Sequence, residues 1–168
     1  MVLTRFFERV RAFVLSPDRS GQGATVSLQP SGDCSLGACA IKPLKILLLE
    51  DDPGNVFVFQ AYLKEMGCPP CDHAATLKDA RAFQTDIENG AYDLVVFDIM
   101  LPDGESFALA GEVSQKTSTP VLAYTGRTDS LDVVAMAQAG FRAVLTKPLD
   151  YREFQDGLAA VLHTERRE

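Results

Sequence analysis

The sequence contains no uninterrupted apolar run of roughly 18 residues or more, the length that a helix needs to cross a bilayer. It also lacks the pattern of a secretory signal. Residues 1–15 carry Arg5, Arg9 and Arg11 among apolar residues, with no continuous apolar stretch leading to a small-residue cleavage site. We therefore expect a cytoplasmic protein without a membrane span.

Cysteine and basic charge are both scarce. The four cysteines predict reduced thiols or a metal site rather than a disulfide framework in a cytoplasmic chain. The net charge is −7, and residues 1–43 carry five Lys and Arg against three Asp and Glu, which leaves eleven against twenty in residues 44–168. Because such an acidic region repels phosphate backbones, we expect protein and cation partners and no nucleic acid.

With 168 residues, 46% apolar and 23% charged, the chain has the composition of one globular domain. Residues 16–43 are rich in Ser, Gly and Pro and are predicted to be a linker, so residues 1–43 form an N-terminal extension to a domain over 44–168. Helical spacing predicts a short amphipathic helix in the extension, able to dock on a partner, a membrane surface or its own domain, at Leu3, Phe6, Phe7, Val10 and Val14.

After residue 43, short apolar runs alternate with longer stretches of helical periodicity. Strands are predicted at 44–49, 94–97, 121–124 and 143–145, with a weaker candidate at 71–75. Helices are predicted at 53–66, 77–89, 105–116, 128–139 and 150–163. Five strands alternating with five helices indicate an α/β fold in which a parallel sheet is covered on both faces.

Charged and hydroxyl side chains follow the predicted strands. Such residues collect at the carboxyl edge of an open parallel sheet, and here they are Glu50, Asp51, Asp98, Thr125 and Lys147. Clustered carboxylates need a compensating cation, and Mg²⁺ prefers oxygen ligands. An aspartate in such a site can attack phosphorus to give an aspartyl phosphate, with the lysine and the threonine hydroxyl holding the phosphoryl oxygens.

Four segments resemble the motifs of response-regulator receiver domains, and the resemblance runs from about residue 44 to 163. They are Lys45-Ile-Leu-Leu-Leu-Glu-Asp-Asp-Pro, Tyr92-Asp-Leu-Val-Val-Phe-Asp-Ile-Met-Leu-Pro-Asp-Gly, Pro120-Val-Leu-Ala-Tyr-Thr-Gly and Leu145-Thr-Lys-Pro. The resemblance implies a flavodoxin-like, doubly wound five-stranded parallel sheet of order 2-1-3-4-5 with five helices. It also implies a cis bond between Lys147 and Pro148.

The resemblance implies a role for each site residue. Asp98 would be the phosphoacceptor, and Thr125 and Lys147 would contact the phosphoryl group. Glu50 and Asp51 would be the acidic pair around Mg²⁺, together with Asp98 and the Met100 carbonyl.

By the same resemblance, the donor is a histidine kinase or a histidine phosphotransfer protein, and the chain is a regulatory phosphoacceptor rather than an enzyme. Because the sequence ends at Glu168 without an output domain, we expect it to signal by contact with a downstream protein target. Two rival functions remain. An aspartate-nucleophile phosphatase needs a second acid at the position of Met100, whereas a non-phosphorylated interaction module is favoured by Val144, where the family usually has an aromatic residue.

Several further positions carry expectations of their own. Asp52 before Pro53 is predicted to cap a helix. Ser106 stands where the family commonly has glycine, and Met100 and Arg127 flank the expected route of the water that removes the phosphoryl group. The helix over 53–66 is apolar beyond one stripe, which favours either partner docking or burial under the N-terminal extension.

The cysteines allow three interpretations. Cys68-Pro-Pro-Cys71 follows a helix and precedes a strand, which is the reverse of a thioredoxin-like redox motif. A zinc site could combine these two thiolates with Cys34 and Cys39, although the spacing is imperfect. Ordinary unligated thiols are the third interpretation. The two histidines, in a predicted strand and at a helix end, are not expected to be phosphodonors.

Overall fold

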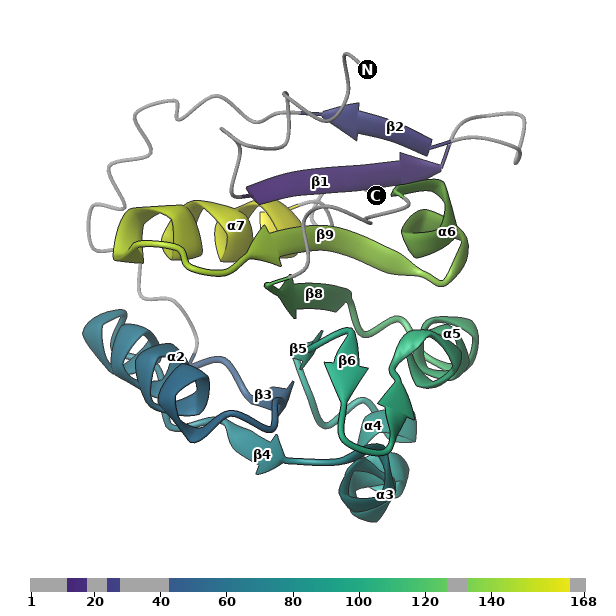
Figure 1. The fold of residues 1–168 in the computed structure, drawn as a ribbon, viewed down its shortest axis with the longest axis horizontal. Helices are drawn as coiled ribbons and strands as arrows, with labels where there is room; N and C mark the ends of the chain where they lie inside the picture. The colour runs from purple at the N-terminus through teal and green to yellow at the C-terminus, as the bar shows by residue number, and fades with distance from the viewer. Residues whose placement is uncertain (1–11, 18–23, 28–42, 127–132, 164–168) are drawn as a thin grey trace.

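The computed structural model describes residues 12–17, 24–27, 43–126 and 133–163, and it shows a large sheet flanked by helices (Figure 1). The sheet has seven strands in the order β2-β1-β9-β8-β5-β3-β4. They are β1 (Ala12–Pro17), β2 (Ala24–Ser27), β3 (Ile46–Leu49), β4 (Asp72–Ala74), β5 (Leu94–Phe97), β8 (Val121–Thr125) and β9 (Phe141–Thr146).

The parallel part of the sheet has the predicted topology. Strands β4, β3, β5, β8 and β9 are paired in parallel, which is the order 2-1-3-4-5 among the five strands of the domain. The buried apolar strands β3, β5 and β8 occupy its centre, as expected for strands that are covered on both faces. The strand predictions are therefore confirmed within a few residues at each end.

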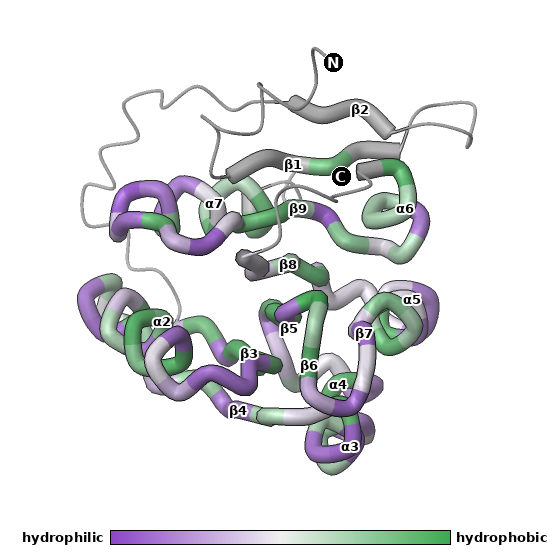
Figure 2. The backbone as a smooth tube through the Cα atoms, in the orientation of Figure 1, coloured by the Kyte–Doolittle hydropathy of each residue, from purple (hydrophilic) through white to green (hydrophobic). Residues whose placement is uncertain are grey.

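Helices cover both faces. On one face lie α2 (Pro53–Glu65) and α7 (Tyr151–His163), which pack against each other through Phe59 and Phe154. The two rings are in an edge-to-face arrangement with their centroids 4.9 Å apart. The other face is covered by α3 (Leu77–Ala80), η1 (Arg81–Phe83), α4 (Gln84–Glu88), α5 (Phe107–Lys116) and α6 (Val133–Gln138). α7 carries both hydrophilic and hydrophobic segments along its length, as expected for a helix with one buried face (Figure 2).

Two local predictions need correction. The segment predicted as one helix over 77–89 is divided by the 3-10 turn η1, a tightening that apolar periodicity does not reveal. The helix predicted over 105–116 begins at residue 107, because the preceding residues form a short hairpin of β6 (Met100–Leu101) and β7 (Gly104–Glu105). The helix predicted over 128–139 is seen as α6, and residues 127–132 lie outside the described residues.

The prediction for the N-terminal extension was wrong in its described parts. Val14, placed in an amphipathic helix, lies in β1, and part of the predicted linker forms β2. These strands make an antiparallel hairpin that joins the sheet at β9. A run such as Ala-Phe-Val-Leu fits helical and strand periodicity alike, and the available strand edge decides between them. The other residues of the predicted helix, from Leu3 to Val10, lie outside the described residues.

Candidate functional site

The ends of three neighbouring strands bring the predicted site residues together. Asp98 follows β5, and its N–H donates to the Leu49 carbonyl at the end of β3, at 2.8 Å. Lys147 follows β9, and its N–H donates to the Thr125 carbonyl at the end of β8, also at 2.8 Å. These bonds continue the ladders beyond the strands, so the residues after β3, β5 and β9 lie at one edge of the sheet. The Lys147–Pro148 bond is cis, as predicted.

Lys147 joins two carboxylates that are far apart in sequence. Its Nζ donates to Asp98 Oδ2 at 2.6 Å and to Glu50 Oε2 in a short bond. Glu50 is fully buried and Asp98 is 9% exposed. Two buried carboxylates would repel each other strongly without a cation, so the lysine ammonium supplies the positive charge that the pocket needs. The same ammonium lies 4.7 Å from the centre of the Tyr124 ring.

Asn55 is a site residue that the sequence analysis missed. Its side-chain amide donates to Glu50 Oε1 at 3.0 Å, and the Asp52 N–H donates to the same oxygen at 3.2 Å. Both Glu50 oxygens are therefore held by protein donors. The Asn55 N–H in turn donates to Asp52 Oδ1 at 2.9 Å, which confirms the predicted cap of α2. That cap was the available signal, because it fixes the first turn of α2 beside Glu50.

Three carboxylates are close enough to share a cation. Glu50, Asp51 and Asp98 each offer an oxygen, and these oxygens lie within 4.8 Å of one another. Asp51 is exposed, whereas the Glu50 oxygens are already bonded to protein donors. Mg²⁺ typically takes one or two carboxylates and keeps several waters, so an exposed Asp51 beside Asp98 fits its requirements. The Met100 N–H donates to Asp98 Oδ1 at 3.2 Å. This contact does not test whether the Met100 carbonyl is a metal ligand, which stays a prediction.

Thr125 and Val144 are buried residues of the neighbouring strands β8 and β9. Thr125 is fully buried at the end of β8 and is paired with Thr146, the residue before Lys147. Val144 is also fully buried, in the apolar cluster that contains Met136 of α6. A branched aliphatic side chain thus fills the place where the family usually has an aromatic ring.

Two more predicted positions fall near the strand ends. Ser106 is fully buried at the start of α5, and among the described residues its hydroxyl has no hydrogen-bond partner. Met100 is 38% exposed beside the phosphoacceptor position. Arg127, the other position expected on the route of water, lies outside the described residues.

Tyr124 stays a neutral phenol beside these carboxylates. Burial raises the pKa of Tyr124 to about 12, and the negative charges of Glu50 and Asp98 act in the same direction. Its ring therefore serves as a neutral wall beneath the lysine ammonium over the whole physiological pH range.

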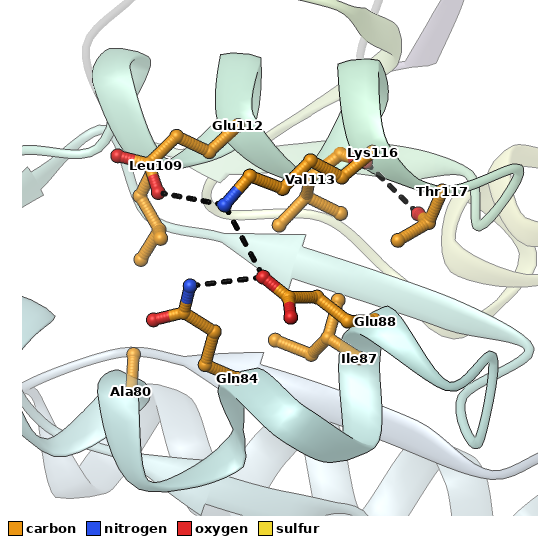
Figure 3. Close-up of a pocket in the computed structure, with 9 residues that line it drawn as sticks. All are labelled: Ala80, Gln84, Ile87, Glu88, Leu109, Glu112, Val113, Lys116 and Thr117. Carbon is orange, nitrogen blue, oxygen red and sulfur yellow. Dashed lines mark hydrogen bonds and ion pairs between the residues drawn. The ribbon is translucent and has the colours of Figure 1, made fainter.

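A second hollow lies between α4 and α5, lined by Ala80, Gln84, Ile87, Glu88, Leu109, Glu112, Val113, Lys116 and Thr117 (Figure 3). Its floor is largely apolar. At its rim Lys116 Nζ is 3.2 Å from Glu88 Oε1 and 4.0 Å from Glu112 Oε2. These are exposed surface pairs of the kind that contribute little energy, and we assign no chemistry to this hollow.

The described thiols are buried and unpaired. Cys68 and Cys71 are 9% and 7% exposed, and the Gln60 side chain binds both the N–H and the carbonyl of Cys71 at 3.1 Å. Burial raises the pKa of the Cys71 thiol to about 11. A thiol with a raised pKa is a poor nucleophile. The predicted zinc site remains untested, since Cys34 and Cys39 lie outside the described residues.

The raised Cys71 pKa predicts how stability changes in alkali. The ordinary thiol pKa is 9.0, so between about pH 9 and 11 the unfolded chain loses this proton before the folded chain does. The folded state then holds more protons, and the free energy of unfolding falls as the pH rises. Chemical denaturation at several pH values should show a shallower fall for Cys71→Ala than for the unchanged chain. Equal slopes in both chains would contradict this explanation.

His73 and His163 lie where the sequence places them. His73 is in β4, and its Nε2 is 2.7 Å from the Glu50 carbonyl oxygen. His163 is the last residue of α7. Neither position suggests a phosphodonor.

Comparison with known proteins identifies the family. A model of the response regulator receiver domain matches residues 46–159. The transcriptional regulatory protein RprY of Bacteroides fragilis is 32% identical over 125 residues, which are 73% of this chain and 51% of that protein. The transcription factor SKN7 of Candida albicans is 27% identical over 151 residues, 88% of this chain and 26% of that protein. The chain thus spans about half or less of these relatives.

Solved structures agree with the fold. A CheY-like response regulator receiver domain protein from Methanospirillum hungatei aligns with a TM-score of 0.65 and 26% identity, covering 75% of this chain and 98% of that one. The receiver domain of the sensor histidine kinase PA1611 from Pseudomonas aeruginosa aligns with a TM-score of 0.61 and 25% identity, over 73% and 99% of the two chains. That structure carries a magnesium ion in its active site cleft. Among the described residues, no helix is long and apolar enough to cross a membrane.

Proposed function

Since this chain belongs to the response regulator receiver domain family, we propose that it accepts a phosphoryl group on Asp98 with the help of Mg²⁺. The donor is the phosphohistidine of a histidine kinase or of a histidine phosphotransfer protein. The observation that carries the proposal is the contact of Lys147 Nζ with Asp98 Oδ2 at 2.6 Å, in a pocket that also holds Glu50 and Asp51.

Asp98 acts as the nucleophile. An oxygen of its carboxylate forms a bond to phosphorus, the bond from phosphorus to the histidine nitrogen breaks, and its electron pair returns to the imidazole. Asp98 is 9% exposed, so it is held in place yet remains open to a partner at the edge of the sheet. The Met100 N–H on Asp98 Oδ1 and Lys147 on Oδ2 fix the orientation of the carboxylate.

Lys147 and Thr125 receive the transferred group. The lysine ammonium moves from the free carboxylates to the phosphoryl oxygens, where the negative charge accumulates during transfer. Support for this role comes from its present bonds to Asp98 and Glu50, which put the cation in the pocket before the donor arrives. Thr125 contributes its hydroxyl from the end of the adjacent strand.

Asp51 and Asp98 are the ligands best suited to Mg²⁺, and Glu50 completes the acidic set. When bound, the ion neutralises the phosphoryl oxygens and the carboxylates that surround them. Asn55 and the Asp52 N–H keep one Glu50 oxygen directed away from Lys147, so the acidic set does not collapse when the lysine moves.

The signal passes on through protein contact. A phosphoryl group on Asp98 adds negative charge beside Lys147 and biases the segments that follow β8 and β9. The downstream protein target then binds at the carboxyl ends of β8 and β9, next to Asp98 and Lys147. The whole regulators that resemble this chain are described as transcriptional regulators, and that activity belongs to those proteins.

Incubation with acetyl phosphate tests the proposal. We expect the intact mass of the chain to rise by one phosphoryl group in Mg²⁺, with no rise when a chelator removes the metal. The absence of any gain would favour a non-phosphorylated interaction module. Steady turnover of phosphomonoesters would instead favour an aspartate-nucleophile phosphatase. The residue at position 100 argues against that enzyme, because it needs an acid at this position and this chain has Met100.

A further inference from the structure

The hairpin of β1 and β2 occupies the edge of the parallel sheet. β1 pairs antiparallel with β9 through Ala12↔Leu145, Phe13↔Val144 and Val14↔Ala143. Figure 1 shows the hairpin continuing the sheet beyond β9, and both α6 and α7 contact β1. Without β1, the backbone of β9 would be an exposed strand edge, which is a template for pairing with another chain.

The hairpin is an addition to the receiver domain. The family match begins at residue 46, after both of its strands. The Methanospirillum receiver is covered over 98% of its own length, whereas it covers 75% of this chain. The edge of β9 is therefore closed here by a segment that the family pattern does not include.

A short part of β1 resembles part of β9, the strand with which it pairs. Phe13-Val-Leu-Ser in β1 matches Ala143-Val-Leu-Thr in β9, with Val and Leu identical and a hydroxyl residue after them. If β1 is replaced by β9 of a second copy in the same register, Val144 of that copy faces Ala143 of the first. The two strands are then related by a two-fold axis between residues 143 and 144.

We propose that β1 is an intramolecular substitute for β9 of a second copy, and that its displacement lets two chains pair through their β9 edges. The antiparallel direction of β1 is the direction that a two-fold symmetric partner would have. Such an isologous interface closes at two chains and does not grow into a fibre. The inference rests on the strand pairing and does not depend on phosphorylation.

A proline in β1 provides the test in the full chain. Val14 is paired with Ser27 on one side and with Ala143 on the other, and Val14→Pro removes its single backbone N–H and puts a proline ring into a strand with neighbours on both sides, which displaces β1. We expect sedimentation equilibrium to give the monomer mass for the unchanged chain and twice that mass for Val14→Pro. Val14→Ala is the matched control, because it keeps the backbone N–H, and it should remain monomeric.

Competition with a peptide that contains β1 tests whether the dimer forms through the β9 edge. Excess synthetic peptide of residues 11–18 should return Val14→Pro to the monomer, and a scrambled peptide of the same composition should not. A folded Val14→Pro chain that stays monomeric would overturn the proposal. So would a dimer that ignores the peptide.

If Val14→Pro does not fold, the unchanged chain can be measured in urea below its unfolding transition, where weakly held elements open first. We then expect dimers that the peptide of residues 11–18 reverses. A chain that remains monomeric until it unfolds would overturn the proposal.

Discussion

No phosphoryl group is expected on the Asp98→Ala chain after incubation with Mg²⁺ and acetyl phosphate. The reason is chemical, because the reaction needs a carboxylate oxygen as nucleophile and alanine has none. Glu50 cannot take over, since both of its oxygens are held by protein donors and its side chain is fully buried. Intact-mass spectrometry should therefore show complete loss of the phosphorylated species.

Asp156→Ala is the matched control for this experiment. It makes the same substitution at an exposed aspartate of α7, and it should be phosphorylated like the unchanged chain. Circular dichroism of both variants establishes that they are folded. A phosphorylated Asp98→Ala chain would place the nucleophile elsewhere and contradict the assignment.

Lys147→Ala is expected to lower the free energy of unfolding by about 3 kcal/mol in the absence of divalent cations, because it leaves two buried carboxylates without their cation. The side chains of Glu50 and Asp98 are 1% and 12% exposed, so water can solvate the two carboxylates only in small part once the ammonium is gone. Added Mg²⁺ should stabilise the variant more than the unchanged chain, since the metal then supplies the missing charge. Urea denaturation with and without Mg²⁺ measures both effects.

Lys116→Ala provides the comparison for Lys147→Ala. Lys116 also contacts two carboxylates, those of Glu88 and Glu112, but all three side chains are between 41% and 50% exposed. Its loss should therefore change the free energy of unfolding by less than about 1 kcal/mol, with no dependence on Mg²⁺. Equal effects of the two substitutions would show that Lys147 does not neutralise a buried acidic pair.

The parallel sheet was predictable because its signals are local and strong. The buried runs at β3, at β5 and over residues 121–124 of β8 are short stretches of aliphatic and aromatic residues, and they are followed by Glu50, Asp98 and Thr125. Asp52 before Pro53 set the start of α2 in the same local way. Such signals depend on a few neighbouring residues, so they can be read from the sequence alone.

What could not be predicted depends on contacts between distant segments. Asn55 reaches Glu50 only because α2 begins at the edge of the sheet, and its residue type alone carries no sign of that contact. Residues 12–17 form a strand because β9 offers an open edge far along the sequence. The Lys147 bonds to Glu50 and Asp98 join residues up to 97 positions apart, and the pattern of strand ends predicted that these residues meet at one edge but not which atoms would bond.

Reduction of the phosphorylated chain with borohydride, followed by peptide mass spectrometry, tests the central claim most directly. The reagent converts an aspartyl phosphate to homoserine and so marks the residue that carried the phosphoryl group. We expect homoserine at position 98, in samples that received both Mg²⁺ and acetyl phosphate. Homoserine at another aspartate, or a phosphorylated chain that yields none, would contradict the proposal that this pocket forms an aspartyl phosphate on Asp98.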